Sequence, residues 1–137
     1  MHKSLWHSPG YTLLVVLFVI PLTGSGVDIY VPSLPAITYY FAVSAATTKL
    51  TIAAYLYGYG FSQLMFGIAS DSTGRKPILL WGLLVLAIAS ICAAWAPSLD
   101  MLLILRFVQG VAVATVGTAT RAILVDRFEG VRPITLR

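Results

Sequence analysis

Four long apolar segments constrain what this chain can fold into. They lie at about residues 11–30, 50–70, 78–95 and 99–124, and the third contains no charged residue. About 20 residues of helix cross a hydrocarbon core about 30 Å thick. Backbone amides in that core must be hydrogen-bonded within their own segment, and no barrel-type alternation of polar and apolar residues occurs. The sequence therefore predicts an all-α membrane protein with four transmembrane helices, formed by residues 1–137 as one unit.

The composition agrees with this prediction and excludes other classes of protein. Of the 137 residues, 58% are hydrophobic and 10% are charged, whereas a soluble domain carries roughly 25% charged residues. A soluble enzyme is therefore excluded. The basic residues stand at the ends of the apolar segments and not along a polar face, so we expect no nucleic-acid partner. The single cysteine and the two tail histidines, His2 and His7, predict no disulfide, metal site or cofactor.

The connecting segments contain residues that begin or interrupt helices. Pro32 and Pro35 lie in a segment, 31–48, that is a poor continuation of a membrane span, and Ser44 is a candidate N-cap for the second helix. Pro77 suits the first turn of the third helix.

Basic residues at the segment ends predict the orientation. With the N-terminus inside, the outer side holds only Lys49, and Arg106 lies within the membrane. The cytoplasmic side then holds Lys3, Arg75, Lys76, Arg121, Arg127, Arg132 and Arg137. We therefore expect both termini to be cytoplasmic, in a multi-pass protein of the plasma (inner) membrane, and the first segment to be retained and not cleaved as a signal peptide.

Small residues predict where the helices approach one another, because helices in lipid gain little hydrophobic free energy by meeting. The first, second and fourth segments carry them, while the third is rich in leucine and is expected to face lipid. The small residues are Gly24, Gly26, Gly58, Gly60, Gly67, Gly110, Ala114 and Gly117.

One arginine within the fourth segment requires compensation. Arg106 lies about 8–10 Å inside the outer end of that helix, and a charge near the bilayer centre costs about 2.5–3.5 kcal/mol. Asp28 in the first segment lies within about 5 Å of the same depth, which predicts an Asp28–Arg106 pair able to exchange a proton. The alternative is that Asp28 lies in water and Arg106 bonds only to carbonyl groups.

Two further groups of polar residues are candidates for function. Tyr55, Tyr59 and Gln63 share one face of the second helix, where they form either interhelical hydrogen bonds or the wall of a substrate cavity. The second group lies at the cytoplasmic turn, where it forms either a latch between helices or a set of solvated charges that fix the topology. Its members are Asp71, Gly74, Arg75, Lys76 and, from the end of the fourth helix, Asp126.

Three motifs of this sequence resemble those of a known family. Residues 67–76 resemble the G-x-L-A-D-R-x-G-R-[RK] turn of the major facilitator superfamily, with departures at Ala69, Ser70 and Ser72. Residues 105–110 resemble the R-x-x-Q-G element of its drug–proton antiporters, and residues 28–37 are similar to the D-x-Y-x-P-x-L-P stretch of its bicyclomycin/chloramphenicol-resistance group.

The resemblance implies an N-terminal part of a helical-bundle transporter that exports drugs by proton antiport. Such transporters rock two six-helix halves around a midplane site. Proton coupling would belong to Asp28 and Arg106, conformational gating to the cytoplasmic turn with Gly67, and substrate contact to Gln109 and Gly110. The partners implied are the lipid bilayer, a small-molecule substrate and protons. Four helices are about a third of such a transporter, so we expect no transport from this chain without the missing helices or another membrane protein.

Two other functions fit four membrane helices. One is a homodimer of the small multidrug resistance type, although that family uses a glutamate midway along its first helix, where this chain has only Asp28 near the end. The other is a membrane-anchored accessory subunit that does not itself transport.

Overall fold

The computed structural model describes residues 9–69 and 75–129, and every regular element in these ranges is a helix. The elements are α1 (Pro9–Gly24), the 3-10 helix η2 (Val31–Ser33), α2 (Leu34–Tyr40), α3 (Ala45–Ala69), α4 (Arg75–Ala94) and α5 (Leu99–Glu129).

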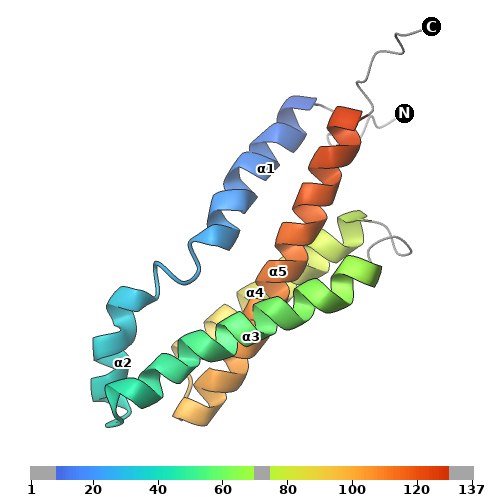
Figure 1. Ribbon diagram of the computed structural model, residues 1–137. Helices are drawn as coiled ribbons and strands as arrows, with labels where there is room; N and C mark the ends of the chain where they lie inside the picture. Colours follow the sequence, from blue (N-terminus) through green and yellow to red (C-terminus); the bar gives the residue numbers. More distant parts are fainter. Residues whose placement is uncertain (1–8, 70–74, 130–137) are drawn as a thin grey trace, which may run out of the picture.

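Helix α5 is the organising element of the bundle. It packs against α1, α3 and α4 (Figure 1), whereas the described residues of α3 and α4 do not pack against each other. The short helix α2 packs against α3 at the end of the bundle where α3 begins. The other helices are therefore held together largely through their contacts with α5.

Two glycines permit the close crossing of α3 and α5. A Cβ atom at Gly58 would meet the carbonyl oxygen of Phe107, and a Cβ atom at Gly110 would meet that of Tyr55. The prediction that small residues mark helix contacts is confirmed at these two positions. It does not hold at Gly24 and Gly60, where a Cβ atom would meet nothing within 4 Å.

Helix α4 packs through one face only. Gly82 lies against Val116, whose Cγ2 atom would be 2.7 Å from an added Cβ, and Leu79 joins Val116 in a small buried cluster. Ile78, Leu83 and Leu86 are partly buried. The other large side chains of α4 are exposed: Leu80, Trp81, Leu84, Val85, Ile88 and Ile91. This exposed apolar face agrees with the expectation that the third segment faces lipid.

Two helices of the described chain are long and apolar enough to cross a membrane. Their apolar stretches are Pro77–Ala94 in α4 and Leu99–Val125 in α5. Each contains 18 residues or more, and at 1.5 Å per residue this length is about that of a bilayer core. Four spans and the orientation of the termini stay predictions.

The first segment differs from its predicted form. Helix α1 ends at Gly24 and not at Tyr30, and the following segment, expected to be a loop, contains η2 and α2. Gly24 and Gly26 weaken the helix at this point, because glycine is a poor helix former. Pro32 and Pro35 stand in the first turns of η2 and α2, where proline is favoured.

Hydroxyl side chains cap two helices. The backbone N–H of Thr47 donates to Oγ of Ser44 at 3.1 Å, which confirms the predicted cap of the second long helix. At the start of α5, the N–H of Met101 donates to Oγ of Ser98 at 3.3 Å, a cap that the sequence analysis missed.

Candidate functional site

Arg106 stacks on an aromatic ring inside the bundle. It lies seven residues after the start of α5, or about 10 Å along the helix. Its guanidinium carbon lies 3.3 Å from the centroid of the Tyr30 ring. A cation over an aromatic face is stabilised by about 0.5–2 kcal/mol, and more strongly where water is excluded. Tyr30 therefore compensates part of the cost of placing this charge within the membrane.

Tyr30 is itself fixed by helix α3. Its side chain is 7% exposed, and its hydroxyl donates to Oγ1 of Thr51 at 2.8 Å. Thr51 is fully buried, and its own hydroxyl donates to the carbonyl of Thr48 at 2.7 Å. This chain of bonds connects the turn after α1 with α3, and the stacked Arg106 connects both with α5. The position of the guanidinium is therefore set by three separate segments.

Arg106 and Gln109 line a cavity of about 820 Å³ between α2, the end of α4 and the first half of α5. The amide nitrogen of Gln109 donates to Oγ of Ser90 at 3.0 Å, which orients the amide. Its buried Oε1 atom and the buried Nε of Arg106 have no hydrogen-bond partner among the described residues. The aromatic part of the lining consists of Tyr30, Tyr40, Phe41 and Trp95.

The cavity therefore offers a cation, an amide oxygen and aromatic faces within a largely apolar wall. This combination suits an amphiphilic small molecule, because a few placed polar groups set orientation while apolar walls supply most of the binding free energy.

The predicted Asp28–Arg106 pair is not formed in this structure. Asp28 is exposed, and no ion pair joins these two described residues. The pairing was inferred from depth along a continuous first helix, but α1 ends at Gly24, and Asp28 lies in the turn that follows. From this turn it is Tyr30, two residues later, that contacts the guanidinium.

The three polar residues of the second segment do not line this cavity. Tyr55 is buried, and its hydroxyl would lie 2.5 Å from a Cβ atom added to Gly26. Tyr59 is partly buried and Gln63 is exposed. Gly110 lies in the crossing of α3 and α5. Of the predicted cavity residues, only Gln109 contributes to the wall.

The predicted gating turn falls largely outside the described residues. Asp71 and Gly74 belong to the undescribed range 70–74. Gly67, Arg75, Lys76 and Asp126 lie near helix ends, in α3, α4 and α5, at positions where the structure describes the backbone only. The latch stays a prediction.

Sequence reasoning missed the residues that hold Arg106 and Gln109 in place, directly or through Tyr30. Tyr30 carries the second fixed position of the D-x-Y stretch at residues 28–37, and this motif was the available signal. Thr51 and Ser90 gave none, because single hydroxyl residues are common in membrane helices and usually bond to their own backbone.

Comparison with known proteins places the chain among membrane transporters. The sequence profile of the Major Facilitator Superfamily matches residues 13–134. The chain is 34% identical to a multidrug resistance protein MdtL of Shewanella sp. strain ANA-3, over 88% of this chain and 30% of that protein. It is 35% identical to a chloramphenicol resistance protein of Pseudomonas aeruginosa, over 80% of this chain and 26% of the relative.

A third relative is a bicyclomycin resistance protein homolog of Haemophilus influenzae, 38% identical over 75% of this chain and 26% of that protein. The chain thus spans less than a third of the length of these relatives. No solved structure matches it. Since the profile covers most of the sequence and the motifs agree with it, the chain belongs to the major facilitator superfamily of transporters.

Proposed function

We propose that this chain is the N-terminal, four-span part of a transporter that exports small molecules in exchange for protons across the plasma membrane. The supporting observation is Arg106, a charge within a membrane-spanning helix that stacks on Tyr30 and lines a cavity together with Gln109. A charge in this position marks a substrate or ion pathway more often than a packing site. The multidrug and chloramphenicol resistance relatives suggest drugs as the substrate class.

In the proposed mechanism, the arginine is a fixed charge and not the proton carrier. A guanidinium stays protonated in proteins, so it cannot release a proton at each cycle. Asp28 is the nearest acid in sequence to the stacked tyrosine, and its exposed position gives it access to protons. We propose that Asp28 is protonated in one state and is drawn toward Arg106 in another, where the positive charge favours loss of its proton.

In this proposal, the substrate binds to the residues that line the cavity around Arg106. The unpaired Oε1 of Gln109 accepts a hydrogen bond from a substrate hydroxyl or amide, and the aromatic side chains cover the apolar part of the molecule. A site built to bond a polar group discriminates against analogues that lack this group.

The remaining helices of the pathway must come from elsewhere in the assembled transporter. The relatives are more than three times as long as the part matched here, so we propose that this chain functions together with further transporter helices or another membrane protein. Both termini lie in the cytoplasm in this proposal. The homodimeric small multidrug alternative is not favoured, because the superfamily profile runs from residue 13 to residue 134.

A chimeric transporter tests the proposal. Residues 13–134 of this chain replace the matching part of the Pseudomonas chloramphenicol resistance protein, and chloramphenicol efflux and proton movement are followed in everted membrane vesicles. We expect Arg106→Gln to abolish efflux driven by a proton gradient. The Asp28→Asn chimera should still carry chloramphenicol down its own concentration gradient. It should no longer carry chloramphenicol against that gradient, because the proposed proton-binding group is missing.

Arg121→Gln serves as the control, because it removes a positive charge from an exposed position of the same helix. Full proton-coupled efflux by the Arg106→Gln chimera, at an expression level equal to that of the control, would refute the assigned role.

A further inference from the structure

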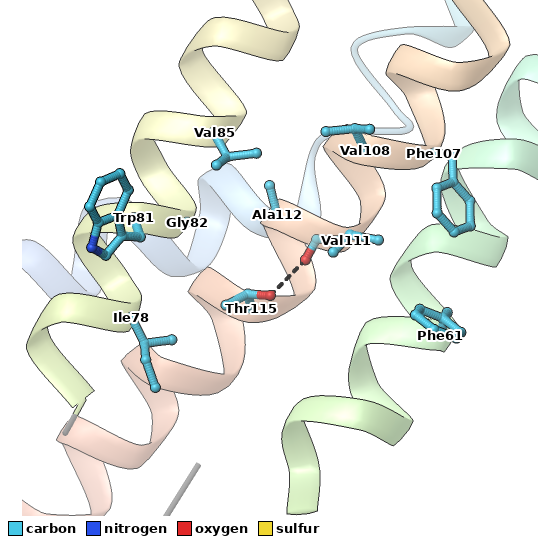
Figure 2. Close-up of a pocket in the computed structure, with 10 residues that line it drawn as sticks. All are labelled: Phe61, Ile78, Trp81, Gly82, Val85, Phe107, Val108, Val111, Ala112 and Thr115. Carbon is cyan, nitrogen blue, oxygen red and sulfur yellow. Dashed lines mark hydrogen bonds between the residues drawn. The ribbon is translucent and has the colours of Figure 1, made fainter. Parts of the chain in front are cut away.

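A second hollow lies on the outside of the bundle, between two helices whose described residues do not pack against each other. Helices α3 and α4 both pack on α5 and leave a groove of about 480 Å³ between them. Figure 2 shows Phe61 of α3 on one side and the side chains of α4 on the other. The floor of the groove is formed by residues of α5, which are Val108, Val111, Ala112 and Thr115. Phe107, also of α5, lies at the side nearer α3.

The groove offers no free polar group to a ligand. Its one hydroxyl belongs to Thr115, which donates to the carbonyl of Val111 at 2.8 Å and lies 3.0 Å from Oγ of Ser62. The indole nitrogen of Trp81 points away from the floor in Figure 2. A polar molecule would lose its hydrogen bonds to water here without replacing them. An occupant of the groove must therefore present an apolar surface, as a hydrocarbon chain does.

The place of the groove along α4 indicates the source of this hydrocarbon. The lining residues Ile78–Val85 cover about 10 Å of helix, within the first half of the apolar span Pro77–Ala94. One leaflet of a bilayer core is about 15 Å thick. The groove thus lies within a single leaflet, along a membrane-spanning helix, as a lipid acyl chain does.

The charge at one end of the groove indicates the headgroup. Helix α4 begins with Arg75 and Lys76, directly before the first residues that line the groove. Basic residues at a membrane surface attract anionic lipids by about fivefold in affinity for each residue.

We propose that this groove binds one acyl chain of an anionic phospholipid, with its headgroup beside the start of α4. The acyl chain packs against the rings of Phe61, Trp81 and Phe107 and lies over the small residues Gly82 and Ala112. The site is separate from the cavity around Arg106 and does not depend on transport.

Quenching of tryptophan fluorescence by brominated lipids tests the proposal with the full chain in vesicles. Trp6 and Trp95 are replaced by phenylalanine, so that Trp81 is the only fluorophore. The vesicles contain increasing fractions of either brominated phosphatidylglycerol, which is anionic, or brominated phosphatidylcholine with the same chains. We expect half-maximal quenching at a fraction at least about fivefold lower for phosphatidylglycerol.

Two variants occupy or open the groove, and two controls do not. Val111→Phe fills the floor, and Phe61→Ala removes a wall at a position that is already exposed. Each should remove the preference for the anionic lipid, while Ile88→Phe, on the exposed face of α4 outside the groove, should keep it. A chain with Trp95 as its only tryptophan, at the far end of α4, should show no preference.

Several results would overturn the proposal. They are equal quenching of Trp81 by the two lipids, a preference that survives both groove variants in chains of unchanged helicity, and an equal preference at Trp95. A Trp81 shielded from both lipids, as by a second copy of the chain, would overturn it as well.

Discussion

The crossing of α3 and α5 makes a sharp prediction for Gly110→Ala. An added Cβ at this position would meet the backbone carbonyl oxygen of Tyr55, and the backbone N of Tyr59 lies 2.9 Å from the same point. Neither atom belongs to a flexible side chain, so the two helices must separate to admit the methyl group.

The size of the effect follows from two opposing terms. Overpacking a filled contact costs about 1–3 kcal/mol, and alanine gains about 1 kcal/mol over glycine as a helix former. Because the clash at Gly110 is with backbone, we expect the upper part of the overpacking range and a net loss of about 1–2 kcal/mol. Gly60→Ala, a control in α3 with open space around the new methyl group, should gain up to about 1 kcal/mol.

Reversible unfolding of the purified chain in mixed micelles, followed by circular dichroism, measures both variants. We expect the free energy of unfolding to shift in opposite directions in the two variants, with a difference of about 2–3 kcal/mol between them. Equal shifts at the two positions would show that α3 and α5 do not cross at Gly110, and would refute the packing described here.

Three further predictions concern single contacts. Tyr30→Phe keeps the ring under Arg106 and removes the hydrogen bond to Thr51, so the free energy of unfolding in micelles should fall by about 0.5–1.5 kcal/mol. An unchanged free energy would exclude the hydrogen bond between Tyr30 and Thr51. Ser44→Ala removes the cap of α3 and should cost about 1 kcal/mol by the same assay, whereas an unchanged stability would contradict the cap. Ala42 has a positive φ of 51°, so Ala42→Gly should raise the midpoint of thermal unfolding, and a lowered midpoint would count against this turn.

The long helices were predictable from the sequence because their signals are local. Long stretches of mainly apolar residues indicated the third and fourth helices. Ser44 marked the start of α3 through a cap that needs only a hydroxyl three residues before a backbone N–H. The extent of the first helix was not predictable in the same way. Gly24 and Gly26 weaken a helix without forbidding it, and packing decides such cases.

The candidate site was predictable in part. Arg106 was found because a charge in an apolar segment is costly wherever the helix packs. Its partner was assigned to Asp28 on charge and depth alone, but these do not determine which way a residue faces once the helix has ended. Tyr30 and Thr51 come together from segments 21 residues apart, and only the tertiary structure shows this contact.

We infer that Arg106 lies in a water-accessible cavity within the membrane and does not meet lipid. Cysteine labelling in native membranes tests this claim, because Cys92 is the single cysteine of the chain and Cys92→Ser gives a cysteine-free background. Arg106→Cys lies in the wall of the cavity, and Ile104→Cys, at a position 65% exposed on the same helix, serves as the control.

We expect a charged, membrane-impermeant thiol reagent to modify the cysteine at position 106 and to leave the one at position 104 unmodified. Labelling at position 104 with none at position 106 would place the arginine against lipid and refute the assignment of Arg106 to a water-accessible cavity.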